Sequence, residues 1–323
     1  RRAAGPPHAR AMDALLDPRC AALPAVFSAS ALQYTRFAKK PMAAPCHWVT
    51  ERLSRRFVLV GMVCEICSFG MLPVAVACPM NASCLLLLYF QKETKRSGAA
   101  VPSLAALSAW ALPFLDPAGG ARPAPWKPEA LLRVLVAPET WGFVCALLAA
   151  AVAAHALGSW TQRRGWFGAT LACAPAALNF GVSAVLLKAF AHVVFAAARA
   201  PQRIELWAAA PALAALLAGV RSAAALPLRR AMEEHDNLSV LSGYGMLSSA
   251  VAMLTGIAVY GELDRWGFQR SAVFLLIALA HCWGMRALGF RGGGLSAAKK
   301  ERLKLEEEAA APPADAGGRR GAE

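Results

Sequence analysis

Four charged residues lie inside or at the ends of long apolar runs: Glu65, Lys188, Arg221 and Glu262. An ionised side chain in such surroundings is costly, so each needs a physical reason to be there. The Glu65 carboxylate could ligate a hard cation or exchange a proton, or it could form a buried structural pair with Lys188 or Arg221. Lys188 could bind an anion, act as a counter-charge that a cation displaces from Glu65, or extend toward an interface.

Arg221 and Glu262 lie near the ends of their apolar runs. This position favours interfacial anchoring for Arg221 and leaves the role of Glu262 open. Neutral amide and hydroxyl groups could supply further oxygen ligands, although most are expected to pack helices together: Asn81, Asn179, Asn237, Ser183, Ser242, Ser248 and Ser249. Small residues favour close helix approach: Gly243, Gly245 and Gly256.

Composition indicates that membrane helices position these residues. Hydrophobic residues make up 57% of the 323 positions, charged residues only 17%, and the mean hydropathy is +0.43. Apolar runs reach the roughly 20 residues that cross a hydrocarbon layer, and Ala and Leu dominate them without strict polar alternation. The chain is therefore predicted to be an all-α polytopic membrane protein in contact with the lipid bilayer.

The apolar runs predict about nine spans arranged as two halves. The expected spans lie near residues 18–38, 57–77, 79–91, 99–115, 141–160, 166–197, 204–227, 238–260 and 271–289. They divide the chain into an N-terminal extension (1–17), an N-terminal half (18–115), a linker rich in Pro and Gly (116–140), a C-terminal half (141–290) and a disordered tail (291–323). The shortness of the run at 79–91 makes a re-entrant segment an alternative to a span there.

The net charge of +14 is distributed between the apolar runs rather than gathered on one basic module. Lys and Arg follow the odd-numbered expected spans, whereas the other connections are sparser in them or balanced by acids. This distribution predicts an N-terminus outside and a C-terminus in the cytosol, and it argues against a nucleic-acid partner.

Enzyme signatures are missing from the sequence. It contains no G-x-x-x-x-G-K-[ST] phosphate loop, no H-E-x-x-H and no G-x-S-x-G. We therefore expect no catalytic residues, and any transport would be passive or driven by a gradient.

Short motifs carry a family resemblance. The segments Gly61-Met-Val-Cys-Glu65-Ile-Cys-Ser-Phe69 and Ala75-Val-Ala-Cys-Pro79, and further on Arg230-Ala-Met-Glu-Glu-His-Asp236, Tyr244 and Tyr260-Gly-Glu262, resemble the NIPA-type magnesium transporters of the drug/metabolite transporter superfamily. Ser183 and Lys188 match a Ser and a Lys five apart in a central helix of that family, and Phe37-Ala-Lys-Lys40 is similar to its first-span ending. The chain departs from the family pattern at Ser68, Arg229, Ser242 and Gly245.

The resemblance implies Mg²⁺ uptake through a cavity between two repeated halves, with Mg²⁺ as transported ion rather than bound cofactor. It implies Glu65 as the metal ligand, and we expect the substrate pathway to include Glu65, Ser183, Lys188, Tyr244 and Glu262. We expect the plasma membrane or an endosomal membrane as its location, with a homodimer as a further option. Two alternatives stay open: a carrier of a small organic, anionic solute contacted by Lys188 and Arg221, and a non-transporting scaffold in which the charges form structural pairs.

Overall fold

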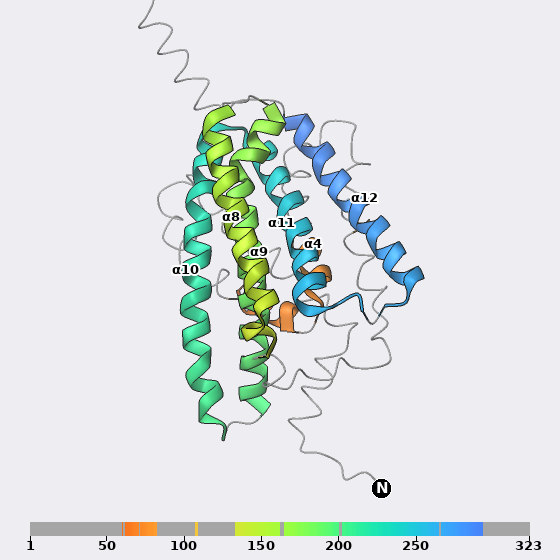
Figure 1. Ribbon diagram of the computed structural model, residues 1–323. Helices are drawn as coiled ribbons and strands as arrows, with labels where there is room; N and C mark the ends of the chain where they lie inside the picture. The colour runs from red at the N-terminus through yellow and green to blue at the C-terminus, as the bar shows by residue number, and fades with distance from the viewer. Residues whose placement is uncertain are drawn as a thin grey trace, which may run out of the picture.

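The computed structural model describes residues 60, 62–70, 72–82, 107–108, 133–161, 165–199, 202–264 and 266–292. Its main elements are α-helices, labelled in Figure 1: α4 (Val74–Ala82), α8 (Pro138–Thr161), α9 (Gly165–Arg199), α10 (Ile204–Glu234), α11 (Asn237–Tyr260) and α12 (Phe268–Gly292). Residues 62–70 are also helical and precede α4. The all-helical class predicted from Ala- and Leu-rich composition is confirmed for these ranges.

Five of these helices are long and apolar enough to cross a membrane. The candidate spans are Pro138–Gly158, Trp166–Ala198, Ile204–Glu234, Ser239–Tyr260 and Phe268–Leu288. They correspond to the five spans expected in the C-terminal half, and they suggest an integral, multi-pass membrane protein associated with a lipid bilayer. The expected span 18–38 and most of the expected spans 79–91 and 99–115 lie outside the described residues.

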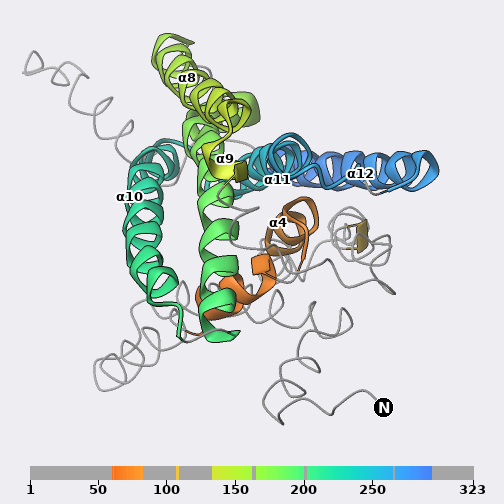
Figure 2. The same ribbon diagram turned by 60° about the horizontal axis from the view of Figure 1, so that its bottom comes forward.

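Helix α9 is the central element of the bundle. It packs against α8, α10 and α11, and α11 in turn packs against α4 and α12; both views show α10 and α12 at opposite sides (Figures 1 and 2). In the apolar stretches of α9 and α11, 61% of the residues are buried, against 6% for α10. The outer helices therefore present Leu and Val side chains outward, as lipid-facing helices do: Leu148, Val152, Leu216, Leu276 and Leu279.

The expected span 57–77 is not one continuous helix. Residues 62–70 are helical, Leu72 and Pro73 are not, and α4 then runs from Val74 across the expected boundary at residue 77. The physical reason is Pro73, which has no backbone N–H and disfavours helical geometry in the residue before it, yet is well suited to precede a new helix. The expected single span is corrected to a broken helix.

Helix α10 is longer than the expected span 204–227. It continues through Pro227 and Arg229 to Glu234, so its 31 residues cover about 46 Å. Helix α9, with 35 residues, is longer still, and Figure 1 shows both helices projecting past the rest of the bundle at the end where they join. As a consequence, Arg221 lies near the middle of α10 rather than near a span end.

Close helix contacts occur at two glycines that the sequence singles out. A Cβ on Gly243 would lie 2.7 Å from the Thr170 hydroxyl of α9, and a Cβ on Gly256 would lie 3.0 Å from the backbone N of Ala75 and would also collide with the Glu262 carboxylate. The prediction of close helix approach is confirmed at both positions. Gly256 therefore allows α11 to reach the start of α4.

Candidate functional site

The helix break at Leu72 and Pro73 exposes backbone groups that no continuous helix satisfies. In a helix that begins at Val74, the first N–H groups have no helical carbonyl four residues earlier to which they could donate. The last carbonyls of the preceding helix likewise have no helical N–H to accept from. The N–H groups of Val76 and Ala77 donate to the Pro73 carbonyl at 3.0 and 2.9 Å. The N–H groups of Val74 and Ala75 and the Leu72 carbonyl need partners from elsewhere in the molecule.

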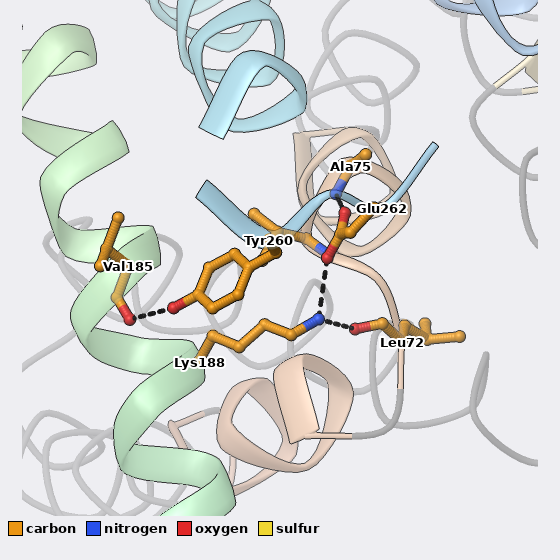
Figure 3. A network of polar contacts seen from close by, with 7 residues as sticks. Leu72, Ala75, Val185, Lys188, Tyr260 and Glu262 are labelled. Atoms are coloured by element: carbon orange, nitrogen blue, oxygen red, sulfur yellow. Dashed lines mark hydrogen bonds and ion pairs between the residues drawn. The ribbon is translucent and has the colours of Figure 1, made fainter. Parts of the chain in front are cut away.

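The carboxylate of Glu262 accepts both remaining amides, and Figure 3 shows its contact with Ala75. Val74 N donates to Oε1 at 2.6 Å and Ala75 N donates to Oε2 at 2.9 Å, so each oxygen holds one N–H. A carboxylate at a helix N-terminus also interacts favourably with the helix dipole. Glu262 thus caps α4 from a different part of the chain.

Local geometry at the end of α11 directs Glu262 to this place. Gly261 has φ of +57°, a left-handed conformation that glycine adopts without strain, and its N–H donates to Ile257 O at 3.1 Å. The resulting turn ends α11 and returns the chain toward α4. The absence of a side chain on Gly256 leaves the space that the carboxylate occupies.

Lys188 of α9 completes the contacts at the break. Its Nζ lies 2.8 Å from Glu262 Oε1 and donates to the Leu72 carbonyl at 3.3 Å. It lies 5.3 Å from the centre of the Tyr260 ring, and the Tyr260 hydroxyl donates to Val185 O at 2.8 Å. Figure 3 shows Lys188 and Glu262 meeting between α9 and the start of α4. Both charged side chains are only 8% exposed.

A second ion pair joins the other side of the broken helix to α10. Arg221 Nη1 donates to Glu65 Oε2 at 2.8 Å and Nη2 donates to Oε1 at 2.7 Å, which is the strong two-bond geometry of an arginine and a carboxylate. The Glu65 side chain is 11% exposed and that of Arg221 is 31% exposed. Arg221 Nε is buried without a hydrogen-bond partner among the described residues.

The two pairs resolve several alternatives left by the sequence. Glu65 forms the buried pair with Arg221, and Lys188 pairs with Glu262 rather than with Glu65. For Arg221 the sequence favoured interfacial anchoring; the structure places it near the middle of α10, with its guanidinium bonded to Glu65 of another helix. The four charges sum to zero, so neither pair leaves an uncompensated buried charge.

The remaining expected pathway residues lie apart from the hydrogen bonds of the two pairs. The Ser183 hydroxyl donates to Asn179 O at 3.1 Å within α9. Tyr244 contacts Phe180 edge to face, with ring centres 6.4 Å apart. The expected metal ligand Glu65 has both oxygens bonded to Arg221, and no group of three or more His, Cys, Asp or Glu gathers within the described ranges.

Sequence reasoning missed one part of this site and left another undecided. It did not identify the backbone groups of Leu72, Val74 and Ala75 as partners of charged residues, and it offered Arg221 only as one of two possible partners of Glu65. Pro73 inside an apolar run was the available signal for the break, since it removes a backbone donor. No comparable signal in a single sequence pairs residues 156 positions apart. The chain matches no protein-family model, no curated protein and no solved structure.

Proposed function

We propose that the protein is a membrane transporter, passive or driven by a gradient, that moves Mg²⁺ or another divalent cation past Glu65. The observation that carries this proposal is the Glu65–Arg221 pair on a broken helix. Its carboxylate has an oxygen-ligand chemistry suited to hard cations, and its two bonds, at 2.7 and 2.8 Å, go to a guanidinium on another helix. Broken helices with charged groups are a recurring feature of transporter pathways.

Arg221 would act as a resident counter-charge in the empty site. An unpaired buried carboxylate is costly, and a guanidinium removes that cost until a cation arrives. The arriving divalent cation would take the carboxylate while Arg221, whose side chain is 31% exposed, moves away. This is the counter-charge role considered for Lys188 from the sequence, assigned now to Arg221 because Arg221 contacts Glu65.

A site with one carboxylate suits transport better than tight binding. Mg²⁺ keeps several of its waters and is commonly held by one or two carboxylates. Conduction also requires binding that is weak enough for the ion to leave. The lack of a larger ligand cluster in the described ranges therefore agrees with passage of a largely hydrated ion. The motifs around Glu65 that resemble magnesium transporters support the same choice of ion.

Uptake into proteoliposomes tests the proposal. Full-length protein is reconstituted, and Mg²⁺ entry is followed with an indicator trapped in the lumen, using empty vesicles as background. Wild-type uptake above background that falls to background in Glu65→Gln supports the proposal. Glu233→Gln is the matched control, because Glu233 is an exposed acid on the outer part of α10 whose side chain is 62% accessible. Wild-type uptake equal to empty vesicles across a panel of divalent cations contradicts the proposal.

One observation favours a second candidate, a carrier of small organic anions. Arg221 has a buried Nε without a described partner and a side chain that is partly accessible, so its guanidinium could bind a carboxylate or phosphate group. In the same vesicles, flux of an organic anion that is lost in Arg221→Gln, together with no divalent uptake, would replace the first proposal with this one. No flux of either class, with every variant folded, would leave the scaffold interpretation.

A further inference from the structure

The two sides of the helix break have opposite polarity and cannot exchange partners. Val74 and Ala75 present N–H donors, which need an acceptor, whereas Leu72 presents a carbonyl, which needs a donor. Glu262 and Lys188 meet these needs in one arrangement only, with the carboxylate on the amides and the ammonium on the carbonyl. An ordinary ion pair has no such preference for direction.

The break is part of the segment that carries Glu65. Phe69 and Val74, on either side of the break, are both fully buried and belong to one apolar cluster with Leu187 of α9. The Ser68 hydroxyl donates to the Glu65 carbonyl at 2.8 Å, so residues 65–68 also hold a fixed local geometry. Because interiors are closely packed, a shift of α4 would be transmitted to the turn that bears Glu65.

Three long helices thus hold the broken segment from separate directions. Lys188 fixes the break to α9, Glu262 fixes it to the end of α11, and Arg221 receives Glu65 on α10. The Glu65 carboxylate must lie in register with the guanidinium fork for both bonds to form, which demands accurate placement of the segment.

We propose that Lys188 and Glu262 are positioning residues that fasten the broken helix by its backbone and thereby place Glu65 at the cation pathway. They act through Glu65 and do not bind the transported ion. This inference rests on the proposed function for its consequence in transport, but the fastening itself can be measured without transport. It also replaces the expectation that Lys188 and Glu262 line the pathway with a specific structural role.

A reversal of the two charges separates this proposal from an ordinary ion pair. In the double variant Lys188→Glu/Glu262→Lys, the opposite charges remain, but an ammonium would face the amides of α4 and a carboxylate would face the Leu72 carbonyl. We expect this double variant to unfold in detergent at a midpoint temperature at least about 5 °C below that of the wild-type protein. Recovery of the wild-type midpoint by the reversed pair would overturn the proposal.

The exposed pair Arg229–Glu233 on α10 provides the matched control. Its N–O distance is 3.1 Å and its side chains are 80% and 62% exposed. The reversed variant Arg229→Glu/Glu233→Arg should shift the unfolding midpoint by less than about 2 °C, because an exposed pair contributes little in either direction. The comparison therefore measures the effect of direction at the break rather than the effect of reversal in general.

The mild variant Glu262→Gln keeps one acceptor oxygen and removes the negative charge. Uptake is normalised to the amount of folded protein, so that a smaller amount of folded protein is not mistaken for weaker transport. We expect the half-saturating concentration of Mg²⁺ to rise about tenfold, as is typical when residues that orient a ligand are altered, and Glu262→Asp to restore it in part. An unchanged half-saturating concentration in Glu262→Gln would show that Glu262 does not position Glu65.

A double-variant cycle on stability tests the same claim without transport. Arg221→Met is made in the wild type and in Glu262→Gln, and unfolding midpoints are compared. If Glu262 places Glu65, the Glu65–Arg221 pair is already weakened in Glu262→Gln, so Arg221→Met should lower the midpoint by no more than half as much there. Equal shifts in the two backgrounds overturn the positioning role even if Mg²⁺ uptake is confirmed. A reduced shift upholds it even if no uptake is found.

Discussion

The two ion pairs on the broken helix differ in what else their members bind. The Glu262 carboxylate holds two backbone amides as well as Lys188, and both side chains are 8% exposed. The Glu65 carboxylate binds the two terminal nitrogens of Arg221, whose side chain is 31% exposed. One pair is therefore a contact fixed by the backbone of α4, whereas the other, in the proposed function, is the contact that a divalent cation replaces.

The largest expected difference between the pairs is the cost of losing the basic partner. Lys188→Met leaves a buried carboxylate and the Leu72 carbonyl without their donor, which should lower the free energy of unfolding by about 3–5 kcal/mol. Arg221→Met should cost less, about 1–3 kcal/mol, because water can reach part of that site. Denaturation in detergent measures both values, and an equal or larger loss in Arg221→Met would remove the distinction.

Replacing both members of each pair should sharpen the contrast. Glu65→Leu/Arg221→Leu removes both charges together, so it should recover about 1–3 kcal/mol relative to Glu65→Leu alone. Glu262→Leu/Lys188→Leu should recover much less, because the amides of α4 lose their acceptor whatever happens to Lys188. Unfolding free energies of the four variants decide this. Equal recovery in both double variants would mean that the backbone contacts of Glu262 contribute little.

Gly256 links α11 to the break and should be sensitive to a single methyl group. Gly256→Ala places Cβ against the Glu262 carboxylate and the Ala75 backbone, so it should destabilise the protein by about 1–3 kcal/mol. Gly219→Ala on α10 is the control, since a Cβ there meets nothing within 4 Å, and it should raise stability by about 0.5–1 kcal/mol through helix propensity. A neutral Gly256→Ala would show that the carboxylate can lie elsewhere.

The smallest expected effect is at Tyr260. Tyr260→Phe keeps the ring beside Lys188 and loses the hydroxyl that donates to Val185 O at 2.8 Å. The loss of one buried hydrogen bond should cost about 0.5–1.5 kcal/mol. Mg²⁺ uptake per folded protein should be unchanged, because the lost hydroxyl bonds to Val185 O and to neither charge of the Lys188–Glu262 pair. A change in the half-saturating Mg²⁺ concentration would place Tyr260 nearer to the pathway than the account allows.

The sequence predicted the long helices of the C-terminal half well because hydropathy alone determines them. Runs such as 166–197 and 238–260 are apolar over a full membrane thickness, and the observed helices match them closely. The break at Pro73 was not predicted, because hydropathy stays high across it. A proline in the sequence does not by itself predict a helix break either, because Pro79, Pro175 and Pro227 all lie inside continuous helices.

The candidate site was predicted in its members, whereas the Glu65–Arg221 pair was only one of several pairings that the sequence left open. Glu65, Lys188 and Glu262 stand out because charge in an apolar run is rare. Which charges meet depends on how α9, α10 and α11 pack, and this is a tertiary property that no local pattern encodes. Arg221 was misplaced because Pro227 and Arg229 resemble a helix end, whereas α10 continues to Glu234.

Binding of Mg²⁺ to the purified protein tests the central claim, that Glu65 exchanges Arg221 for a divalent cation. Titration calorimetry in detergent compares wild type, Arg221→Gln and Glu65→Gln, with Glu233→Gln as control. The account predicts that Arg221→Gln binds Mg²⁺ at least about tenfold more tightly than wild type, a gain of about 1.4 kcal/mol, because the competing guanidinium is gone, and that Glu65→Gln loses the binding. Equal binding in wild type, Arg221→Gln and Glu65→Gln would contradict it.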